Sequence, residues 1–106
     1  MKILAMAKVD PQTTLEKMQP HLEAEVKYAW KLYKEGTFRE MYDRQDRTGV
    51  VFVLECSSVD EARRILDELP FVREKIIDFE IIPLEPFPFF EVLFTDYEPP
   101  GSKGAS

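Results

Sequence analysis

Hydrophobic positions repeat along the chain with two different periods. Apolar side chains that alternate with polar ones, or that fill both sides of a short run, are typical of strands, whereas spacings of three and four residues are typical of helices. The first pattern predicts four strands, at residues 2–9, 37–44, 49–56 and 76–84. The second pattern predicts two helices, at residues 20–35 and 58–69. The predicted order is therefore strand, helix, strand, strand, helix, strand.

Capping residues mark the ends of the two predicted helices. Pro20 suits the first turn of the first helix, and Gly36 suits the position just after its C-terminal end. Ser58 and Glu61 match a capping box, in which both side chains accept hydrogen bonds from backbone amides at the helix start. Pro70 is expected to end the second helix, because the residue before a proline disfavours helical geometry.

This order of elements predicts a ferredoxin-like βαββαβ subunit of the α+β class. In that fold a four-stranded antiparallel sheet carries two helices on one face. The other face of the sheet is then bare, yet the strands at 2–9, 49–56 and 76–84 have apolar residues on both sides. Because large exposed apolar patches mark interaction sites, we expect a second surface to cover that face.

Segment 85–95 is rich in phenylalanine, but its prolines do not fit a central strand. We interpret it as an arm that packs across a subunit boundary, because exposed aromatic clusters mark interfaces. The alternative is that it folds back on its own sheet. Residues 96–106 have no apolar pattern and are predicted to be a flexible tail. We therefore expect one ferredoxin-like domain, residues 1–95, that includes the arm.

Charge and composition narrow the chemistry. The 106 residues include 14 Lys and Arg against 20 Asp and Glu, a net charge of -6 that would repel nucleic acid and anionic membranes. With one cysteine, Cys56, and one histidine, His21, the chain forms no internal disulfide and lacks the usual zinc frameworks. Lys2, Lys8 and Asp10 interrupt the first apolar run, so we expect no signal peptide or membrane span. We expect a cytoplasmic protein without metal, cofactor or nucleic-acid partner.

A set of short motifs extends along most of the chain, up to Phe94. Its members are Tyr33 with Gly36, Arg39-Glu40-Met41-Tyr42, Asp46, residues 49–55, Asp60-Glu61-Ala62, Leu69-Pro70 and Phe79-Glu80-Ile81-Ile82-Pro83-Leu84. Together they resemble the muconolactone Δ-isomerase-like family of the dimeric α/β-barrel superfamily. In that superfamily two ferredoxin-like subunits pack their sheets face to face. The resemblance therefore implies a homodimer, with a higher homo-oligomer formed through the arm as a further option.

Glu25 is the leading candidate for acid and base chemistry. The apolar arc of the predicted 20–35 helix is centred on Leu22, Val26, Ala29 and Tyr33. Glu25 falls inside this arc, where burial would raise its pKa toward neutrality. His21 lies four residues earlier, close enough to share a proton with the carboxylate or to orient it. The alternative for this pair is a structural hydrogen bond or ion pair at the rim of the core.

Three further residues are candidates for substrate binding. Arg39 could hold a substrate carboxylate, or else form an ion pair with Glu25 or Glu55. The Tyr42 hydroxyl could bind a lactone oxygen, with packing as the alternative, and Trp30 could wall a pocket for a ring compound or belong to the core. Strict alternation along the second strand groups Arg39, Met41 and Asp43 on one face and Phe38, Glu40 and Tyr42 on the other.

The resemblance suggests a small cofactor-free isomerase that acts on a lactone or a related cyclic carbonyl compound. Glu25 or His21 would remove a proton beside the carbonyl and return it elsewhere, and Arg39 would hold the oxyanion. A non-catalytic protein that binds a small hydrophobic ligand, or that serves as an assembly unit, is the alternative. A cofactor-independent oxygenase is a third hypothesis. A haem held by His21 has no support beyond the single histidine.

Overall fold

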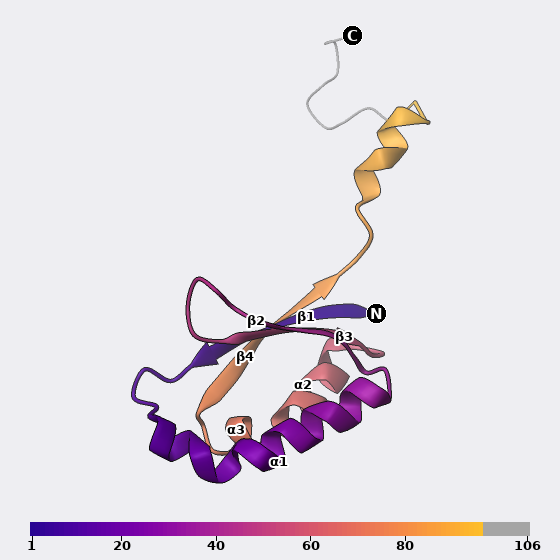
Figure 1. The fold of residues 1–106 in the computed structure, drawn as a ribbon. Coiled ribbons are helices and arrows are strands. Elements are labelled where there is room, and N and C mark those ends of the chain that lie inside the picture. Colours follow the sequence, from indigo (N-terminus) through magenta and orange to yellow (C-terminus); the bar gives the residue numbers. More distant parts are fainter. Residues whose placement is uncertain (97–106) are drawn as a thin grey trace.

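A four-stranded antiparallel sheet forms one layer of the fold, which a computed structural model describes for residues 1–96 (Figure 1). The strands are β1 (Lys2–Val9), β2 (Phe38–Asp43), β3 (Val50–Glu55) and β4 (Ile77–Leu84). Their order across the sheet is β2-β3-β1-β4. The four strands begin and end within one residue of the predicted bounds. Of the predicted tail, only Asp96 belongs to the described residues, so that prediction lies outside them.

The helices α1 (Leu15–Lys34), α2 (Val59–Asp67) and α3 (Pro70–Arg73) form the second layer. Figure 1 shows all of them beneath the same face of the sheet. The predicted ferredoxin-like α+β architecture is therefore confirmed. Within residues 1–96, no helix combines the length and the apolar character needed to cross a membrane.

α1 begins five residues before the predicted start. The side chain of Thr14 caps the helix by accepting a hydrogen bond from the backbone N–H of Lys17 at 3.2 Å. Pro20 lies inside the helix rather than in its first turn. The prediction from Pro20 was wrong because a proline early in a helix removes only one backbone hydrogen bond, and the Thr14 cap stabilises the turns before it.

The C-terminal end of α1 is where Gly36 predicted it. The Gly36 N–H donates to the Tyr33 carbonyl at 3.1 Å, and the Thr37 N–H donates to the Leu32 carbonyl at 3.0 Å. This pair of bonds is a Schellman motif, which needs a residue in the left-handed region after the helix. Gly36 supplies it with φ of +82°. The turn then leads directly into β2.

The capping box of α2 is present in a modified form. The backbone N–H of Glu61 donates to the Ser58 hydroxyl at 3.0 Å, as predicted. The Glu61 carboxylate, however, reaches back to the backbone N–H of Ser57 at 3.3 Å instead of that of Ser58. Pro70 follows the end of α2, but it also begins α3, because proline fits the first turn of a helix. The expected loop after residue 70 therefore contains a short helix.

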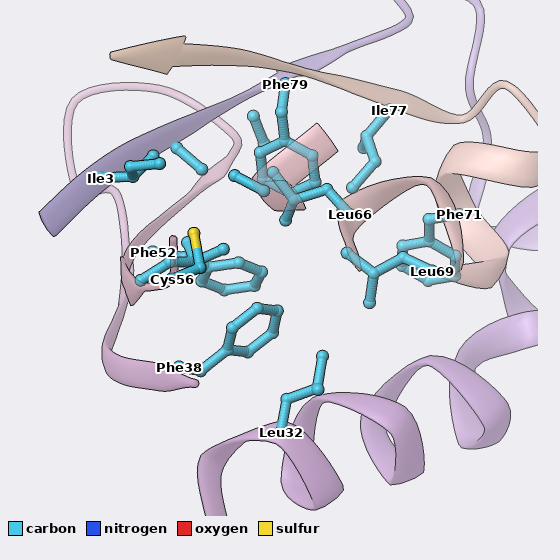
Figure 2. Packing of buried hydrophobic residues seen from close by; sticks show 14 of the residues in the cluster. Ile3, Leu32, Phe38, Phe52, Cys56, Leu66, Leu69, Phe71, Ile77 and Phe79 are labelled. Atoms are coloured by element: carbon cyan, nitrogen blue, oxygen red, sulfur yellow. The ribbon is translucent and has the colours of Figure 1, made fainter. Parts of the chain in front are cut away.

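The hydrophobic core fills the space between the sheet and the helices (Figure 2). Three aromatic rings form its centre: Phe38 lies 4.8 Å from Phe52, and Phe52 lies 5.5 Å from Phe79, between ring centroids. Leu66 of α2 is fully buried against this layer. Every residue of the buried cluster lies between Ile3 and Phe79. The fold up to β4 thus contains its own complete core.

The opposite face of the sheet carries an apolar centre that no part of residues 1–96 covers (Figure 1). Leu4 of β1 is paired with Val53 on one side and with Ile82 on the other. Met6, two residues along, pairs with Val51. All five side chains are only partly buried. We call Leu4, Met6, Val51, Val53 and Ile82 the open face.

A bulge in β2 changes the predicted alternation. The register shifts between Phe38 and Glu40, so Phe38 pairs with Leu54 while Glu40 pairs with Val53. Phe38 is therefore buried on the helix side with Met41, whereas Glu40 lies on the open-face side with Tyr42. Grouping Phe38 with the latter pair was wrong, because the extra residue, Arg39, breaks the period of two.

The aromatic arm, residues 85–95, leaves the sheet at the end of β4. Its centre is η1 (Pro88–Leu93), a 3-10 helix. Figure 1 shows that the arm projects away from both layers and does not fold back on its own sheet. Phe87 makes edge contacts with Phe89 and Phe90, at centroid distances of 5.4 and 4.9 Å. Packing of the arm across a subunit boundary stays a prediction.

Candidate active site

An apolar cavity of about 480 Å³ lies between α1 and the helix side of the sheet. α1 contributes Met18, Leu22, Glu25, Val26, Ala29 and Trp30. The sheet contributes Ala7, Val9, Met41, Tyr42, Asp43, Val50, Phe52 and Ile77, and Phe71 of α3 closes one end. Cavities of this size accept small organic ligands. The few polar groups on this wall therefore decide what chemistry it can support.

Glu25 is the buried carboxyl of the site. Only 9% of its surface is exposed, and its Oε1 accepts a hydrogen bond of 2.9 Å from the backbone N–H of Phe71. Burial raises the pKa of Glu25 above its ordinary value of 4.5, and the bond from Phe71 offsets part of that rise. Of the described residues that line the cavity, none is basic, so no cation there lowers the pKa further. The site thus favours the protonated form of this carboxyl more than water does.

The sequence of α1 orients Glu25 inward through a line of residues spaced three and four apart. Tyr28 and Leu32 follow Glu25 on this line, and Leu32 is buried in the core. The Tyr28 hydroxyl donates to the Ile65 carbonyl of α2 at 2.9 Å, which fixes the rotation of α1 against its neighbour. With that rotation fixed, the Glu25 side chain is held at the cavity wall.

The predicted centre of the apolar arc of α1 was wrong. Leu22, Val26 and Tyr33 are 46%, 58% and 48% exposed, so they lie on an outer flank of the helix. The core instead receives the line through Glu25, because α1 bridges the cavity and packs mainly on α3 and β2. We call Leu22, Val26, Trp30 and Tyr33 the α1 ridge. Leu22, Val26 and Trp30 also form one rim of the cavity.

Trp30 belongs to the rim of the cavity rather than to the core. Its side chain is 58% exposed, and its ring stacks on Tyr33 with 5.7 Å between centroids and 6° between planes. A flat aromatic surface at the cavity mouth fits the predicted role as a wall for a ring compound. That role stays a prediction.

Asp43 brings a carboxylate to the β2 side of the cavity, and Tyr42 lies at the same edge with its side chain on the open-face side. The Tyr42 hydroxyl donates to Oε1 of Glu40 at 2.5 Å, and this bond raises the pKa of the phenol. Tyr42 is 56% exposed, so packing does not hold it in the core. Binding of a substrate oxygen by Tyr42 stays a prediction.

Two of the predicted site residues do not line the cavity. Arg39 lies at the bulge of β2, at the other end of the sheet, beside Glu55. The N-terminal amine donates to Glu55 at 2.5 Å and lowers its pKa most, and Arg39 adds to the same effect. His21 is half-buried on α1, and within residues 1–96 no hydrogen bond or ion pair joins it to Glu25. Their proposed roles in binding and proton transfer stay predictions.

The hairpin loop beside the cavity contains residues that sequence reasoning missed. Thr48 and Gly49 both line it. Gly49 has φ of +147°, and a Cβ there would lie 3.3 Å from the Ala7 carbonyl oxygen. The preceding loop is held by Arg44, whose guanidinium donates to both carboxylate oxygens of Asp46, at 2.8 and 2.6 Å, and keeps the pKa of Asp46 at about 2. The positive φ is the kind of signal that only the folded chain reveals.

Cys56 and the acidic residues offer no competing site. Cys56 is buried, and burial raises the pKa of its thiol, which disfavours the reactive thiolate. Across residues 1–96, no group of three or more His, Cys, Asp or Glu side chains is placed to hold a metal ion. The Glu25 cavity is therefore the candidate active site.

Residues 1–87 match the YCII-related domain, which is most of the chain. The chain belongs to the YCII-related domain family. A search of the curated proteins finds no match for this domain.

Two solved structures share the fold of this YCII-related domain. The first is 5-chloro-2-hydroxyhydroquinone dehydrochlorinase (TftG) from Burkholderia phenoliruptrix AC1100, in complex with 2,5-dihydroxybenzoquinone, with a TM-score of 0.66 and 18% identity over 80% of this chain and 94% of that one. The second is muconolactone isomerase, with a TM-score of 0.68 and 22% identity over 84% of this chain and 93% of that one.

These similarities confirm the fold that the sequence motifs indicated. The subunit has the same fold as muconolactone isomerase, one of its structural neighbours. At such low identity the likeness concerns the fold alone. The pairing of two sheets is not part of a single chain and stays a prediction.

Proposed function

We propose that this YCII-related domain is a small enzyme that transfers a proton within a cyclic carbonyl compound, with Glu25 as the acid and base. The observation that carries the proposal is a buried carboxyl, with a raised pKa, in the wall of a largely apolar cavity. A carboxyl whose pKa is raised toward working pH is better suited both to accept and to return a proton.

The reaction needs two proton transfers that balance. The Glu25 carboxylate removes a proton from a carbon beside the carbonyl, and the electrons of the C–H bond form an enolate. The resulting Glu25 carboxylic acid then donates that proton to a different carbon of the conjugated system, which moves the double bond and restores the carboxylate. The substrate is isomerised without an oxidant or a cofactor.

The enolate oxygen needs a hydrogen-bond donor in the intermediate. Because the described lining contains no basic residue, the Thr48 hydroxyl at the cavity rim is the donor that this proposal uses. The Tyr42 hydroxyl already donates to Glu40 on the open-face side of β2. The backbone N–H of Phe71 is already bonded to Glu25 and holds the carboxyl in place. Substrate rings would lie against Trp30 and Phe52.

The two structural neighbours guide the choice of test compounds. One is named as an isomerase of muconolactone, and the other is named as a dehydrochlorinase and holds 2,5-dihydroxybenzoquinone. Both names describe small rings with acidic C–H or O–H groups beside a carbonyl. Lactones and hydroxyquinones are therefore the substrate classes to try first.

The decisive experiment follows turnover and hydrogen exchange together. Purified protein is incubated with muconolactone or 2,5-dihydroxybenzoquinone in D₂O, and ultraviolet absorbance and NMR report conversion and deuterium uptake. We expect Glu25→Gln to lose activity by about a hundredfold or more. Glu23→Gln is the matched control, because Glu23 is exposed on the same helix and pairs with Lys27 at 2.9 Å. Equal activity in Glu25→Gln and the wild type would disprove the assignment.

A non-catalytic ligand-binding protein is the second candidate, and the apolar lining of the cavity favours it equally. Quenching of Trp30 fluorescence by an added ring compound reports binding independently of turnover. Saturable quenching without any conversion or exchange would favour this second function over the first.

We also propose that two chains pair through the open face. A contiguous apolar patch in the centre of a sheet is the kind of surface that subunit interfaces bury. In the superfamily that the sequence resembles, two such subunits pack their sheets together. A higher homo-oligomer would form through the aromatic arm, which is not part of the open face.

A further inference from the structure

The aromatic arm exposes a large apolar surface within its own chain. Phe87, Phe90 and Phe94 are 62%, 64% and 82% exposed. The rings of Phe87, Phe89 and Phe90 already pack edge to face, so they form one preassembled cluster. An ordered cluster of this kind binds at a lower entropic cost than a disordered segment.

The α1 ridge is a second exposed apolar surface, at the mouth of the Glu25 cavity. Trp30 and Tyr33 present stacked rings there, and Val26 is more than half exposed beside them. This ridge is separate from the open face, because α1 lies on the opposite side of the sheet (Figure 1). Two sheets that pack face to face would leave it uncovered.

Charge makes the two surfaces complementary. Residues 85–96 contain Glu85, Glu91 and Asp96 and no basic residue. Residues 22–34 of α1 contain Lys27, Lys31 and Lys34 against Glu23 and the buried Glu25. Lys27 is paired with Glu23, so Lys31 and Lys34 supply the positive charge beside Trp30 and Tyr33. Opposite charges around an apolar contact favour association and fix its orientation.

The arm does not lie on the ridge of its own chain. It starts at the sheet edge opposite β2, with α2 packed under β4, and it projects away from both layers (Figure 1). The ridge is therefore left free for an arm that comes from another chain.

We propose that the aromatic arm of one chain docks along the α1 ridge of a second copy and closes the mouth of its Glu25 cavity. The phenylalanine cluster then lies against Trp30 and Val26, and Glu91 lies near the lysines of α1. The cavity in a single chain is open at this rim, so the partner's arm completes its wall. The inference does not depend on which reaction the cavity performs.

Trp30 provides a direct test, because it is the one tryptophan among the 106 residues. Fluorescence and acrylamide quenching are compared for the full chain, for a chain that ends after Asp96, and for a chain that ends after Leu84. The last retains the complete core, which spans Ile3 to Phe79. We expect blue-shifted, protected Trp30 emission in the first two proteins and red-shifted, accessible emission in the third. Equal emission in all three would overturn the proposal.

A mixing experiment shows whether docking occurs between chains. The chain that ends after Leu84 is mixed with full-length Trp30→Phe, which has an arm but no tryptophan. We expect the blue shift to return, because the full-length Trp30→Phe chain supplies its arm to Trp30 of the truncated chain. Failure of the blue shift to return, in a mixture that does form hybrid oligomers by native mass spectrometry, would overturn the proposal.

Charge reversal in the full chain tests the orientation without truncation. Glu91→Lys is expected to expose Trp30 to acrylamide, and a second change, Lys34→Glu, is expected to restore part of the protection. Glu74→Lys after α3 is the matched control, because Glu74 is an exposed acid outside the arm and outside the open face. An equal effect of Glu74→Lys and Glu91→Lys would contradict docking of the arm on α1. None of these readouts uses turnover, so their failure is distinct from failure of the proposed reaction.

Discussion

The backbone N–H of Phe71 donates a hydrogen bond of 2.9 Å to Oε1 of Glu25, across 46 residues of sequence. This bond links the middle of α1 to the first turn of α3. It satisfies one carboxylate oxygen, and it leaves the other side of the carboxyl to the cavity. The same bond thus positions the Glu25 carboxyl and offsets part of the rise in its pKa that burial causes.

The raised pKa of Glu25 predicts how stability depends on pH. A carboxyl whose pKa is higher in the folded chain than in the unfolded chain stabilises the fold while it is protonated. That contribution is complete below the ordinary value of 4.5 and is lost as the pH rises through the raised value. Glu25→Gln cannot ionise and can still accept from Phe71. We therefore expect it to gain stability over the wild type as the pH rises from 4 to 8.

Urea unfolding of both proteins across that pH range measures this difference directly. Contributions from all other ionisable groups cancel in the comparison, provided that they are the same in the two proteins. A constant difference in unfolding free energy between pH 4 and pH 8 would show that Glu25 titrates normally.

The open face predicts the effect of a charge at its centre. Leu4 lies between Val53 and Ile82, so Leu4→Lys would place an ammonium group in the middle of the proposed sheet-to-sheet contact. We expect light scattering to report the loss of this dimer, with an unchanged circular dichroism spectrum. Lys8→Gln is the control, because Lys8 lies on the same face of β1 and pairs with Asp78 of β4. Light scattering should give this variant the same mass as the wild type.

Gly49 predicts a local cost for any side chain beside the cavity. An alanine there would need φ of +147° and would bring its Cβ within 3.3 Å of the Ala7 carbonyl oxygen. We expect Gly49→Ala to lower the free energy of unfolding by about 1–3 kcal/mol, the usual range for such strain. Gly36→Ala should cost less in thermal unfolding, because its Cβ would have no atom nearer than 3.9 Å.

Removal of the Ser58 cap of α2 should lower the stability of the fold only modestly. The Ser58 hydroxyl satisfies the Glu61 N–H, so Ser58→Ala should destabilise the fold by about 1 kcal/mol. Ser58→Asp keeps an acceptor at the same position and should restore most of the loss. Equal melting temperatures for the wild type and Ser58→Ala would mean that water replaces the cap without cost.

The fold could be predicted because its signals are local. Strand alternation, the Schellman turn at Gly36 and the cap at Ser58 each depend on a few neighbouring residues, and all three are present in the structure. The start of α1 was missed for the same reason. Pro20 is a strong local signal, but the Thr14 cap and tertiary packing prevail over it.

The site could be predicted only in part, because its geometry depends on contacts between distant segments. Glu25 was identified from its place on a helical wheel, and it does line the cavity. The rotation of α1 is set by the Tyr28 bond to Ile65, so a wheel centred on Leu22 and Val26 misplaces the apolar arc. The bulge at Arg39 likewise shifted Phe38 to the other face, which no strict alternation could show.

The separation of the arm from the core has a consequence for how assemblies of this kind can diversify. Within residues 1–96, every buried side chain precedes the last residues of β4, so substitutions beyond Leu84 leave the core unchanged. The length and composition of the arm can therefore differ between related proteins while the globular part keeps its fold. On the proposed docking, each such difference would alter subunit assembly and access to the Glu25 cavity together.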